Sequence, residues 1–298
     1  MKRRALNTVS PGAGAAIHVV FILCTLACVI PFLIVVGVSF TDERIVMRVG
    51  YRLIPRVFSL QAYKFLALDI QQIGRSYLIS IIVTGVGTVV SLIMTALYAY
   101  PLFRKDFPYR RFFAVFLFIT MVFNGGLVPF YILYTQYLHL KNSLIALILP
   151  YLLNPFYVIV MRTFLTGSIP DSLVESAKLD GAREITVLFR IVAPLALPAF
   201  ATIGLFTTLM YWNDWFMSLL FISNRQNVSI QYYMLKTMQN IQFMLQNPSV
   251  AFKVNRSAMP SETVRMAMAV VGIGPIVVAY PFFQKYFIQG LTVGAIKG

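Results

Sequence analysis

Residues 76–103 read SYLISIIVTGVGTVVSLIMTALYAYPLF, a stretch of 28 residues without Asp, Glu, Lys or Arg. An α-helix needs about 20 such residues to cross the hydrocarbon core of a bilayer. Backbone polar groups in lipid must be hydrogen-bonded within the segment, and tilted membrane strands would instead give short alternating runs. The stretch therefore predicts a membrane-spanning helix.

Five further stretches have the same character, and the composition of the whole chain agrees with them. Hydrophobic residues make up 59% of the 298 residues and charged residues only 12%, with a mean hydropathy of +0.77. Soluble domains carry about 25% charged residues. We therefore expect an all-α, polytopic membrane protein in which residues 1–298 form a single transmembrane domain. The six predicted spans cover residues 15–40, 76–103, 112–137, 143–163, 191–221 and 265–285.

The basic residues are dispersed, and they favour one orientation of the spans. The formal net charge is +15, but Lys and Arg lie singly between long apolar runs, which excludes a nucleic-acid-binding stripe. An even number of spans places both termini on one side. The cluster at residues 2–4 and the basic residues Arg104, Lys105, Arg110 and Arg111 favour the cytoplasm as that side. Counted over all loops, 13 basic residues fall inside and 12 outside, so the charges alone support this orientation weakly.

The sequence argues against a disulfide scaffold, a metal or nucleophile site and a phosphate-binding loop. Cys24 and Cys28 lie four positions apart in an apolar run, and we interpret them as packing residues. His18 and His139 lie 121 positions apart without acidic neighbours, which argues against a metal or nucleophile site. There is no G-x-x-x-x-G-K-[ST] phosphate loop, so we expect no ATP hydrolysis and no enzyme activity from this chain. The apolar run after residues 2–4 is too long for a signal-peptide core and is expected to be a retained anchor.

The segment after the fourth span predicts a short helix outside the membrane. It reads IPDSLVESAKLDGA over residues 169–182. Pro170 precedes the expected start, and Ser172 with Glu175 has the spacing of a capping box. Asp171 adds negative charge at the positive end of the helix. Gly181 suits the helix end, where a left-handed residue lets the chain turn.

One face of this predicted helix is narrow. Leu173, Ala177 and Gly181 follow one another at intervals of four residues, and such a face can sit in a groove on a partner protein. The alternative is an amphipathic connector that rests on the membrane surface. The local pattern does not separate the two interpretations.

The same segment resembles the EAA loop of binding-protein-dependent ABC importer permeases. Glu175-Ser176-Ala177 is followed by Gly181, by Ile191 ten positions later, and by Ala193-Pro194. Ser176 stands for the usual first Ala and Ala193 for the usual Leu, and both keep a small or apolar side chain. The resemblance implies that residues 164–190 form a cytoplasmic coupling loop whose motif covers residues 175–194.

Three other stretches resemble the carbohydrate-importer branch of this family, which is related to the maltose permeases. They are FNGGLVP at residues 123–129, the triplet WND at 212–214, and QKYFIQGLTVGAIKG at 284–298. The first and third of these are similar to the subgroup that handles oligosaccharides and polysaccharide fragments, and the triplet resembles the branch as a whole. The resemblance covers nearly the whole chain.

The resemblance implies a type I ABC importer permease fold with six transmembrane helices and a cytoplasmic coupling helix. The implied partners are a second homologous permease that completes a heterodimer, two ATPase subunits that bind ATP and Mg, an extracytoplasmic solute-binding protein and membrane lipid. No cofactor is expected on this chain. The implied location is the bacterial inner membrane, with both termini cytoplasmic and outer loops at 41–75 and 222–264. The residues implied to couple the chain to the ATPase are Glu175, Ser176, Ala177, Asp180, Gly181, Ile191 and Pro194.

Polar residues near the spans are candidates for a substrate pathway. Trp212, Asn213 and Asp214 could supply a stacking plane and hydrogen bonds to a sugar, with Tyr211 at the same level. The alternative is an interfacial aromatic anchor with a polar helix end. Asn124 lies in a glycine-containing interruption of the third span, which either exposes backbone to the pathway or allows close helix packing. We expect close packing there.

The long segment after residue 222 is aromatic and rich in amides. Tyr232, Tyr233, Gln239 and Gln242 are candidates for contact with the solute-binding protein, and a plain exposed loop is the alternative. The outer loops carry a surplus of +7, from 12 basic and 5 acidic residues. That surplus suits an acidic binding protein, an anionic oligosaccharide or anionic lipid headgroups equally well.

The expected function is ATP-driven import of an oligosaccharide by alternating access. One candidate cargo is an anionic uronate oligosaccharide such as an alginate fragment. Alternatives that use the same machinery are a neutral oligosaccharide, a polyol or a glycerophosphodiester. An ion-coupled secondary transporter would need an ionisable residue near the middle of the bilayer. The predicted spans contain no central charged residue, and Asp214 is marginal.

Overall fold

The computed structural model describes residues 11–246, 261–274, 276–277 and 281. Over these residues the chain is helical, with a single isolated antiparallel bridge between Thr41 and Phe58, which confirms the all-α class. The chain divides into two compact units. The first combines residues 1–70 with 238–273, and the second combines residues 71–237 with 274–298.

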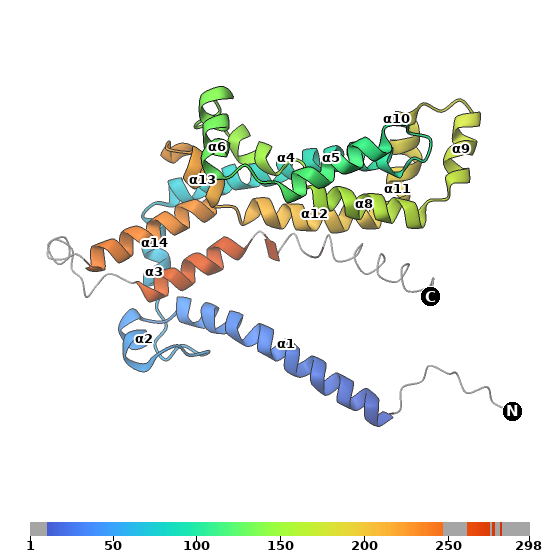
Figure 1. The fold of residues 1–298 in the computed structure, drawn as a ribbon. Helices are drawn as coiled ribbons and strands as arrows, with labels where there is room; N and C mark the ends of the chain where they lie inside the picture. Colours follow the sequence, from blue (N-terminus) through green and yellow to red (C-terminus); the bar gives the residue numbers. More distant parts are fainter. Residues whose placement is uncertain (1–10, 247–260, 275, 278–280, 282–298) are drawn as a thin grey trace. The chain divides into compact units, whose positions relative to one another are not determined.

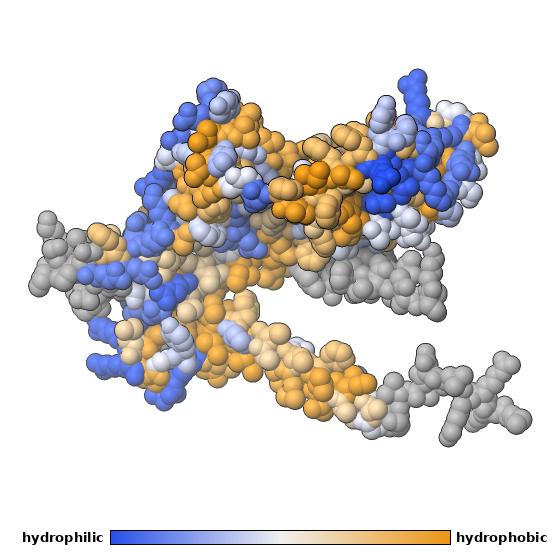
Figure 2. Space-filling view, in the orientation of Figure 1, coloured by the Kyte–Doolittle hydropathy of each residue, from blue (hydrophilic) through white to orange (hydrophobic). Residues whose placement is uncertain are grey.

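The first unit begins with a long apolar helix. Its helices are α1 (Pro11–Ser39), α2 (Glu43–Val49), α3 (Gln61–Ala67) and a helix over residues 262–274. Figure 2 shows α1 as an almost continuous hydrophobic surface, and its most apolar part is exposed along the whole length. Cys24 and Cys28 are exposed on this helix, so their interpretation as packing residues is wrong. The sequence could not reveal this, because an apolar run does not show which of its side chains another helix covers.

Glu43 at the start of α2 holds the first turn of the helix over residues 262–274. Its carboxylate accepts hydrogen bonds from the backbone N–H groups of Glu262 and Thr263 at 3.0 and 2.9 Å, and from the hydroxyls of Ser261 and Thr263 at 3.0 and 2.7 Å. Partial burial opposes ionisation, but these donors hold the pKa of Glu43 below its ordinary value. The carboxylate thus accepts hydrogen bonds from N–H groups that have no partner within the helix, and its negative charge is favourable at the helix N-terminus.

The second unit contains the remaining helices, including three pairs that bend sharply (Figure 1). The helices in chain order are α4 (Ile70–Phe103), α5 (Arg110–Val122), α6 (Leu127–Ile132), η1 (Leu133–Tyr137), α7 (Ile145–Ile148), η2 (Leu149–Tyr151), α8 (Pro155–Ser168), α9 (Asp171–Leu179), α10 (Glu184–Val187), η3 (Leu188–Val192), α11 (Ala193–Leu195), α12 (Leu197–Trp212), α13 (Phe216–Phe221), η4 (Arg225–Asn227) and α14 (Ile230–Gln246). α14 runs across the boundary between the two units.

The described residues contain two uninterrupted helices that are long and apolar enough to span a membrane, at 12–39 and 70–103. Three further segments qualify only as bent pairs: 110–137 with a bend of 109°, 145–168 with 50° and 184–212 with 84°. Pro155 and Pro198 stand in the first turns of the helices that follow the last two bends. Proline is favoured there because those N–H groups have no partner within the helix. Of the sixth predicted span, 265–285, the structure describes residues 265–274, 276–277 and 281.

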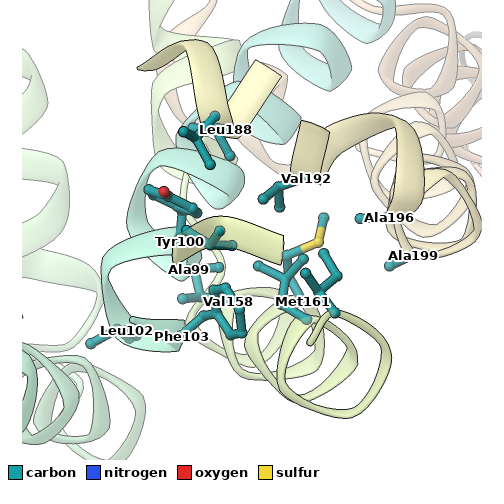
Figure 3. Packing of buried hydrophobic residues seen from close by; sticks show 14 of the residues in the cluster. Ala99, Tyr100, Leu102, Phe103, Val158, Met161, Leu188, Val192, Ala196 and Ala199 are labelled. Atoms are coloured by element: carbon teal, nitrogen blue, oxygen red, sulfur yellow. The ribbon is translucent and has the colours of Figure 1, made fainter. Parts of the chain in front are cut away.

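A hydrophobic core joins α4, α8, α9 and the helices from α10 to α12 (Figure 3). Its fully buried members include Ala99 of α4, Val158 and Met161 of α8, and Val192 of η3. Val174 of α9 belongs to the same cluster. The short helix α9 is therefore attached by its apolar side to the long helix bundle.

Candidate coupling site

The helix α9 begins two residues earlier than the predicted capping box requires. Pro170 is the extended N-cap residue and offers no side-chain hydrogen bond, while Ser172 lies inside the helix. The hydroxyl of Ser176 donates to the carbonyl of Ser172 at 2.9 Å. The capping box of Ser172 and Glu175 is therefore wrong, because a capping hydroxyl must precede the first helical residue.

The end of α9 follows its prediction closely. Gly181 has φ of +82° and donates its N–H to the carbonyl of Lys178 at 2.9 Å, and Ala182 donates to Ala177 at 3.0 Å. These two bonds form a Schellman motif, in which the left-handed residue reverses the chain and satisfies the last carbonyls. Glycine occupies this position without the steric cost that a Cβ would add.

The predicted narrow face of α9 is only partly correct. Ala177 is 9% exposed and packs with Val174 into the core of the same chain, so it cannot enter a groove on a partner. The exposed apolar side chains are Leu173 and, above all, Leu179, which is 89% exposed at the last helical position. Leu179 was absent from the predicted site. Its position two residues before Gly181, at the predicted end of the helix, was the available signal.

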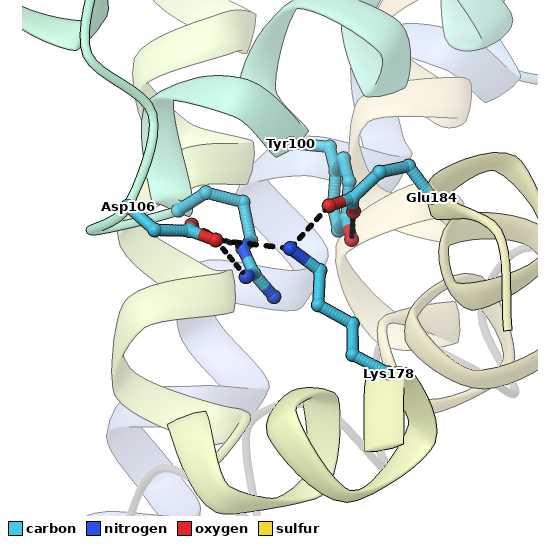
Figure 4. Close-up of polar contacts among 5 residues, drawn as sticks. Tyr100, Asp106, Lys178 and Glu184 are labelled. Carbon is cyan, nitrogen blue, oxygen red and sulfur yellow. Dashed lines mark hydrogen bonds and ion pairs between the residues drawn. The ribbon is translucent and has the colours of Figure 1, made fainter. Parts of the chain in front are cut away.

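Ion pairs attach both ends of α9 to the residues that follow α4, and Figure 4 shows those at its C-terminal end. Lys178 Nζ lies 2.9 Å from Asp106 Oδ2 and 2.5 Å from Glu184 Oε1. Arg104 donates to both carboxylate oxygens of Asp106 at 2.6 and 2.8 Å, and Tyr100 Oη donates to Glu184 Oε2 at 2.5 Å. We call these five residues the α9 clamp. It links the C-terminal end of α9 to α4 and to α10.

A further ion pair holds the other end of α9. Lys105 Nζ lies 2.6 Å from Asp171 Oδ2, at the first residue of the helix. Residues 104–106 therefore contact α9 near both of its ends. A pocket of about 420 Å³ lies between these contacts. Its lining residues are Arg104, Lys105, Asp106, Asp171, Glu175, Lys178 and Leu179.

The contacts within the α9 clamp lower the pKa values of its two carboxyl groups. The Arg104 guanidinium first, and then Lys178, hold the pKa of Asp106 well below its ordinary range. Burial of Glu184 opposes ionisation, but the hydrogen bonds from Lys178 and Tyr100 keep its pKa lowered. A carboxyl group with a lowered pKa in the folded state stabilises that state above its ordinary pKa of about 4. This contribution is complete at neutral pH and is lost as the pH falls through the lowered pKa values.

The other predicted coupling residues fall into two groups. Glu175, Ser176 and Asp180 are exposed on α9 or directly after it, near Gly181. Ile191 packs against the hydrophobic core and Pro194 lies exposed in α11. Only the first group shares the exposed end of α9 with Leu179.

The predicted sugar-stacking role of Trp212 is not supported by its surroundings. Trp212 and Tyr211 are both buried, the Trp212 ring lies 6.0 Å from that of Tyr77, and Tyr211 Oη donates to the carbonyl of Ile148 at 2.7 Å. The Tyr211 ring also fills the space where a Cβ on Gly87 would stand. These contacts place both aromatic side chains in helix packing within the chain, which differs from the predicted stacking plane and also from the alternative of an interfacial anchor.

Asp214 likewise has a structural environment. Its carboxylate accepts hydrogen bonds from Tyr151 Oη at 2.9 Å and from the N–H of Met217 in the first turn of α13 at 3.2 Å. Asn213 is exposed, and so is Trp215, which was not among the predicted residues. The accessible polar and aromatic groups at this level are therefore Asn213 and Trp215.

The interruption at Asn124 creates a bend rather than a close helix contact. Asn124 Oδ1 accepts a hydrogen bond from the N–H of Gly126 at 2.9 Å, and Gly126 has φ of +84°. A Cβ on Gly125 or Gly126 would meet no atom within 4 Å. The expectation of close packing is therefore wrong, since these glycines permit the turn between α5 and α6.

The residues predicted to contact the binding protein lie on a helix, α14, where a loop was expected. Tyr232 and Tyr233 are half-buried against the neighbouring core, whereas Gln239 and Gln242 are exposed. Residues 247–260 of the same predicted outer loop, and the motif at 284–298, lie outside the described residues.

Residues 86–293 match the family described as the binding-protein-dependent transport system inner membrane component. The chain belongs to this family. The permease is 37% identical to the polygalacturonan/rhamnogalacturonan transport system permease protein YtcP of Bacillus subtilis, over 93% of this chain and 95% of the relative. It is 29% identical to the arabinooligosaccharides transport system permease protein AraQ of the same organism, over 95% of each chain.

A solved structure has the same fold as the permease. It comes from a bacterial ABC transporter involved in the import of the acidic polysaccharide alginate, with a TM-score of 0.79 and 29% identity over 94% of this chain and 99% of that chain. The fold class and the resemblance stated from the sequence are thus confirmed. The chain is a sugar or oligosaccharide permease of the ABC importer type and not an enzyme.

The α9 clamp predicts a measurable effect of Lys178→Met. Removing the ammonium group breaks two ion pairs, and each exposed pair contributes about 0–1 kcal/mol. We expect hydrogen exchange of the α9 amides in the purified complex to accelerate by up to about thirtyfold, because the two pairs together contribute at most about 2 kcal/mol and 1.4 kcal/mol corresponds to one factor of ten in an equilibrium constant. Lys64→Met, which removes an exposed ammonium outside the clamp, is the matched control. Unchanged exchange in Lys178→Met would show that the clamp does not hold α9.

Proposed function

We propose that this permease is one of two transmembrane subunits of an importer whose ATP is hydrolysed by separate chains. The second subunit is a homologous permease, and two ATPase subunits bind ATP and Mg. A solute-binding protein outside the membrane delivers the cargo. Membership of a binding-protein-dependent family supports these partners. We place the chain in a bacterial inner membrane, with both termini and α9 in the cytoplasm.

The ATPase moves the permease through the exposed end of α9. Leu179, Glu175 and Gly181 provide an apolar anchor, a charge and a turn without side-chain bulk on one accessible end of a short helix. The single observation that supports this role best is the α9 clamp, because it connects that exposed end to α4, the longest helix that the structure describes. A connection through paired charges and a packed core lets the helix move as part of a rigid body.

Alternating access follows from this connection. Closure of the two ATPase subunits on ATP displaces α9, and the clamp transmits the displacement to the end of α4 and to α10. The cavity shared with the second permease then changes the side to which it opens. ATP shifts the complex from one of these states to the other only because ATP binds more tightly to one state than to the other. In this scheme the residues of α9 transmit force, and none of them takes part in bond chemistry.

The cargo that we propose is an anionic oligosaccharide built from uronate sugars. The names of two similar proteins support this choice, one for polygalacturonan and rhamnogalacturonan and one for the acidic polysaccharide alginate. The relative named for arabinooligosaccharides favours a neutral oligosaccharide as the second candidate. Exposed Asn213 and Trp215 suit either cargo. An amide and an aromatic ring can bind a sugar whether or not that sugar carries a carboxylate elsewhere.

The cargo is tested by the ATPase activity of the whole complex in liposomes. The binding protein is loaded in turn with uronate and neutral oligosaccharides of matched length. We expect stimulation by the uronate set several times larger than by the neutral set. Stimulation by the neutral set alone would reassign the cargo and leave the importer function in place. Absence of stimulation by any loaded binding protein would contradict the importer proposal itself.

A further inference from the structure

Residues 43–60 fold back onto the end of the apolar helix α1. The N–H of Asp42 donates to the carbonyl of Val57 at 3.2 Å. Gly37 lies so close to the carbonyl of Leu53 that a Cβ on this glycine would clash with it. The segment is therefore held at the level where α1 ends. Because α1 has the length and composition of a membrane span, this level is the boundary between lipid and water.

The turn back onto α1 is also fixed by aromatic stacking. Thr41 and Phe58 form the isolated β-bridge, and Ser59 donates its N–H to the carbonyl of Phe40 at 2.8 Å. The ring of Phe40 stacks on Phe58 at 5.6 Å and on Tyr63 at 4.9 Å. These contacts all lie within the first unit. The segment has one defined position relative to the end of α1.

Four arginines of this segment have exposed side chains. They are Arg44, Arg48, Arg52 and Arg56, all exposed, and none forms an ion pair with any residue that the structure describes. The nearby acids are occupied. Glu43 accepts four hydrogen bonds from residues 261–263, and Glu262 pairs with Arg265 and accepts from Tyr51. The surface of the segment is therefore strongly positive.

Large apolar side chains alternate with these arginines. Ile54 is 76% exposed, Met47 69% and Phe58 66%. Figure 2 shows hydrophilic and hydrophobic side chains mixed around α2, in contrast to the mostly apolar surface of α1. Clustered arginines next to exposed apolar groups, at the end of a membrane span, characterise segments that lie in the headgroup region of a bilayer.

We propose that residues 43–60 bind the phosphate groups of anionic phospholipids in the leaflet at the C-terminal end of α1. The guanidinium groups match phosphate oxygens in geometry and charge, while Ile54, Met47 and Phe58 insert among the lipid chains beneath. An acidic protein surface would suit the arginines but would leave these apolar side chains without a hydrocarbon environment. The inference uses the proposed function only to assign this leaflet to the outer side of the membrane.

The test uses the assembled complex in a defined mixture of phosphatidylglycerol and phosphatidylcholine. Native mass spectrometry counts the lipids of each kind that the complex retains. The variant is the triple substitution Arg44→Gln, Arg48→Gln and Arg52→Gln. Each basic residue at an anionic surface contributes about a factor of five. We therefore expect the preference for phosphatidylglycerol to fall by about a hundredfold.

The matched control removes three exposed lysines outside the segment, Lys64, Lys141 and Lys236, again by substitution with Gln. It should keep the preference of the unmodified complex, and an Arg→Lys triple at the variant positions should keep most of it. An equal loss of the preference for phosphatidylglycerol in the lysine control would mean that the preference depends on net charge alone, and this would overturn the proposal. Retained lipid preference in the arginine variant, with weakened stimulation by the binding protein, would make the segment a protein-binding surface. A complex that shows the preference without any stimulation would contradict the importer function and leave the lipid site intact.

Discussion

A complex that carries Gly181→Trp is expected to lose at least about nine-tenths of its ATP-driven uptake. Two effects combine. A side chain other than glycine at φ of +82° costs about 1–2 kcal/mol, which weakens the turn after α9. A Cβ at this position meets no atom of the chain itself within 4 Å, so the indole projects outward from the exposed helix end. It would then occupy the surface through which we propose that the ATPase docks.

Two companion variants separate these effects, with uptake into liposomes and ATPase co-purification as the measurements. Gly181→Asn should retain most activity, because asparagine tolerates the left-handed conformation and adds little bulk. Gly181→Ala should show the backbone cost alone. Normal uptake and normal ATPase binding in Gly181→Trp would mean that this end of α9 faces no partner.

Leu179→Asp is expected to weaken binding of the ATPase to the permease by about tenfold to a hundredfold. The side chain is 89% exposed, so its removal costs the permease little of its own packing. Burying a leucine in a partner contributes about 1.5–3 kcal/mol, and a carboxylate in the same place would be desolvated without a counter-charge. The measurement is the affinity of the purified ATPase for the permease pair in detergent, followed by coupled uptake.

Leu68→Asp is the matched control for this variant. Leu68 is 83% exposed and lies in the first unit, at the C-cap of α3, on the side that we expect to face outward. The two substitutions change charge and exposed apolar area alike. Unchanged ATPase affinity in Leu179→Asp, or an equal loss in Leu68→Asp, would contradict the docking role of α9.

Local physical chemistry explains which expectations about α9 were correct. The turn at Gly181 depends on the backbone of neighbouring residues, and the Schellman motif formed as expected. The start of the helix depends on contacts made elsewhere. Asp171 pairs with Lys105, from a distant part of the chain, and Pro170 supplies the extended N-cap residue. The capping box therefore failed although its spacing was correct.

The same distinction applies to the candidate substrate pathway. The composition of residues 211–214 indicated a polar and aromatic helix end, which the structure contains. Whether these groups are accessible depends on their neighbours. Tyr151, 63 positions away in the sequence, hydrogen-bonds Asp214, and Tyr77 lies beside Trp212. The identity of residues 211–214 does not show that these distant tyrosines lie beside them.

The all-helical membrane class, the family and the position of the motif at residues 175–194 could be predicted from the sequence, because they depend on apolar length and local spacing. The buried position of Ala177, the exposure of Leu179 and the contacts of the α9 clamp could not be predicted, because they depend on how distant segments pack. The ion pair between Lys178 and Asp106 joins residues 72 positions apart. Charges so distant meet only after the core of α4, α8 and η3 has packed, and that packing is a property of the whole fold.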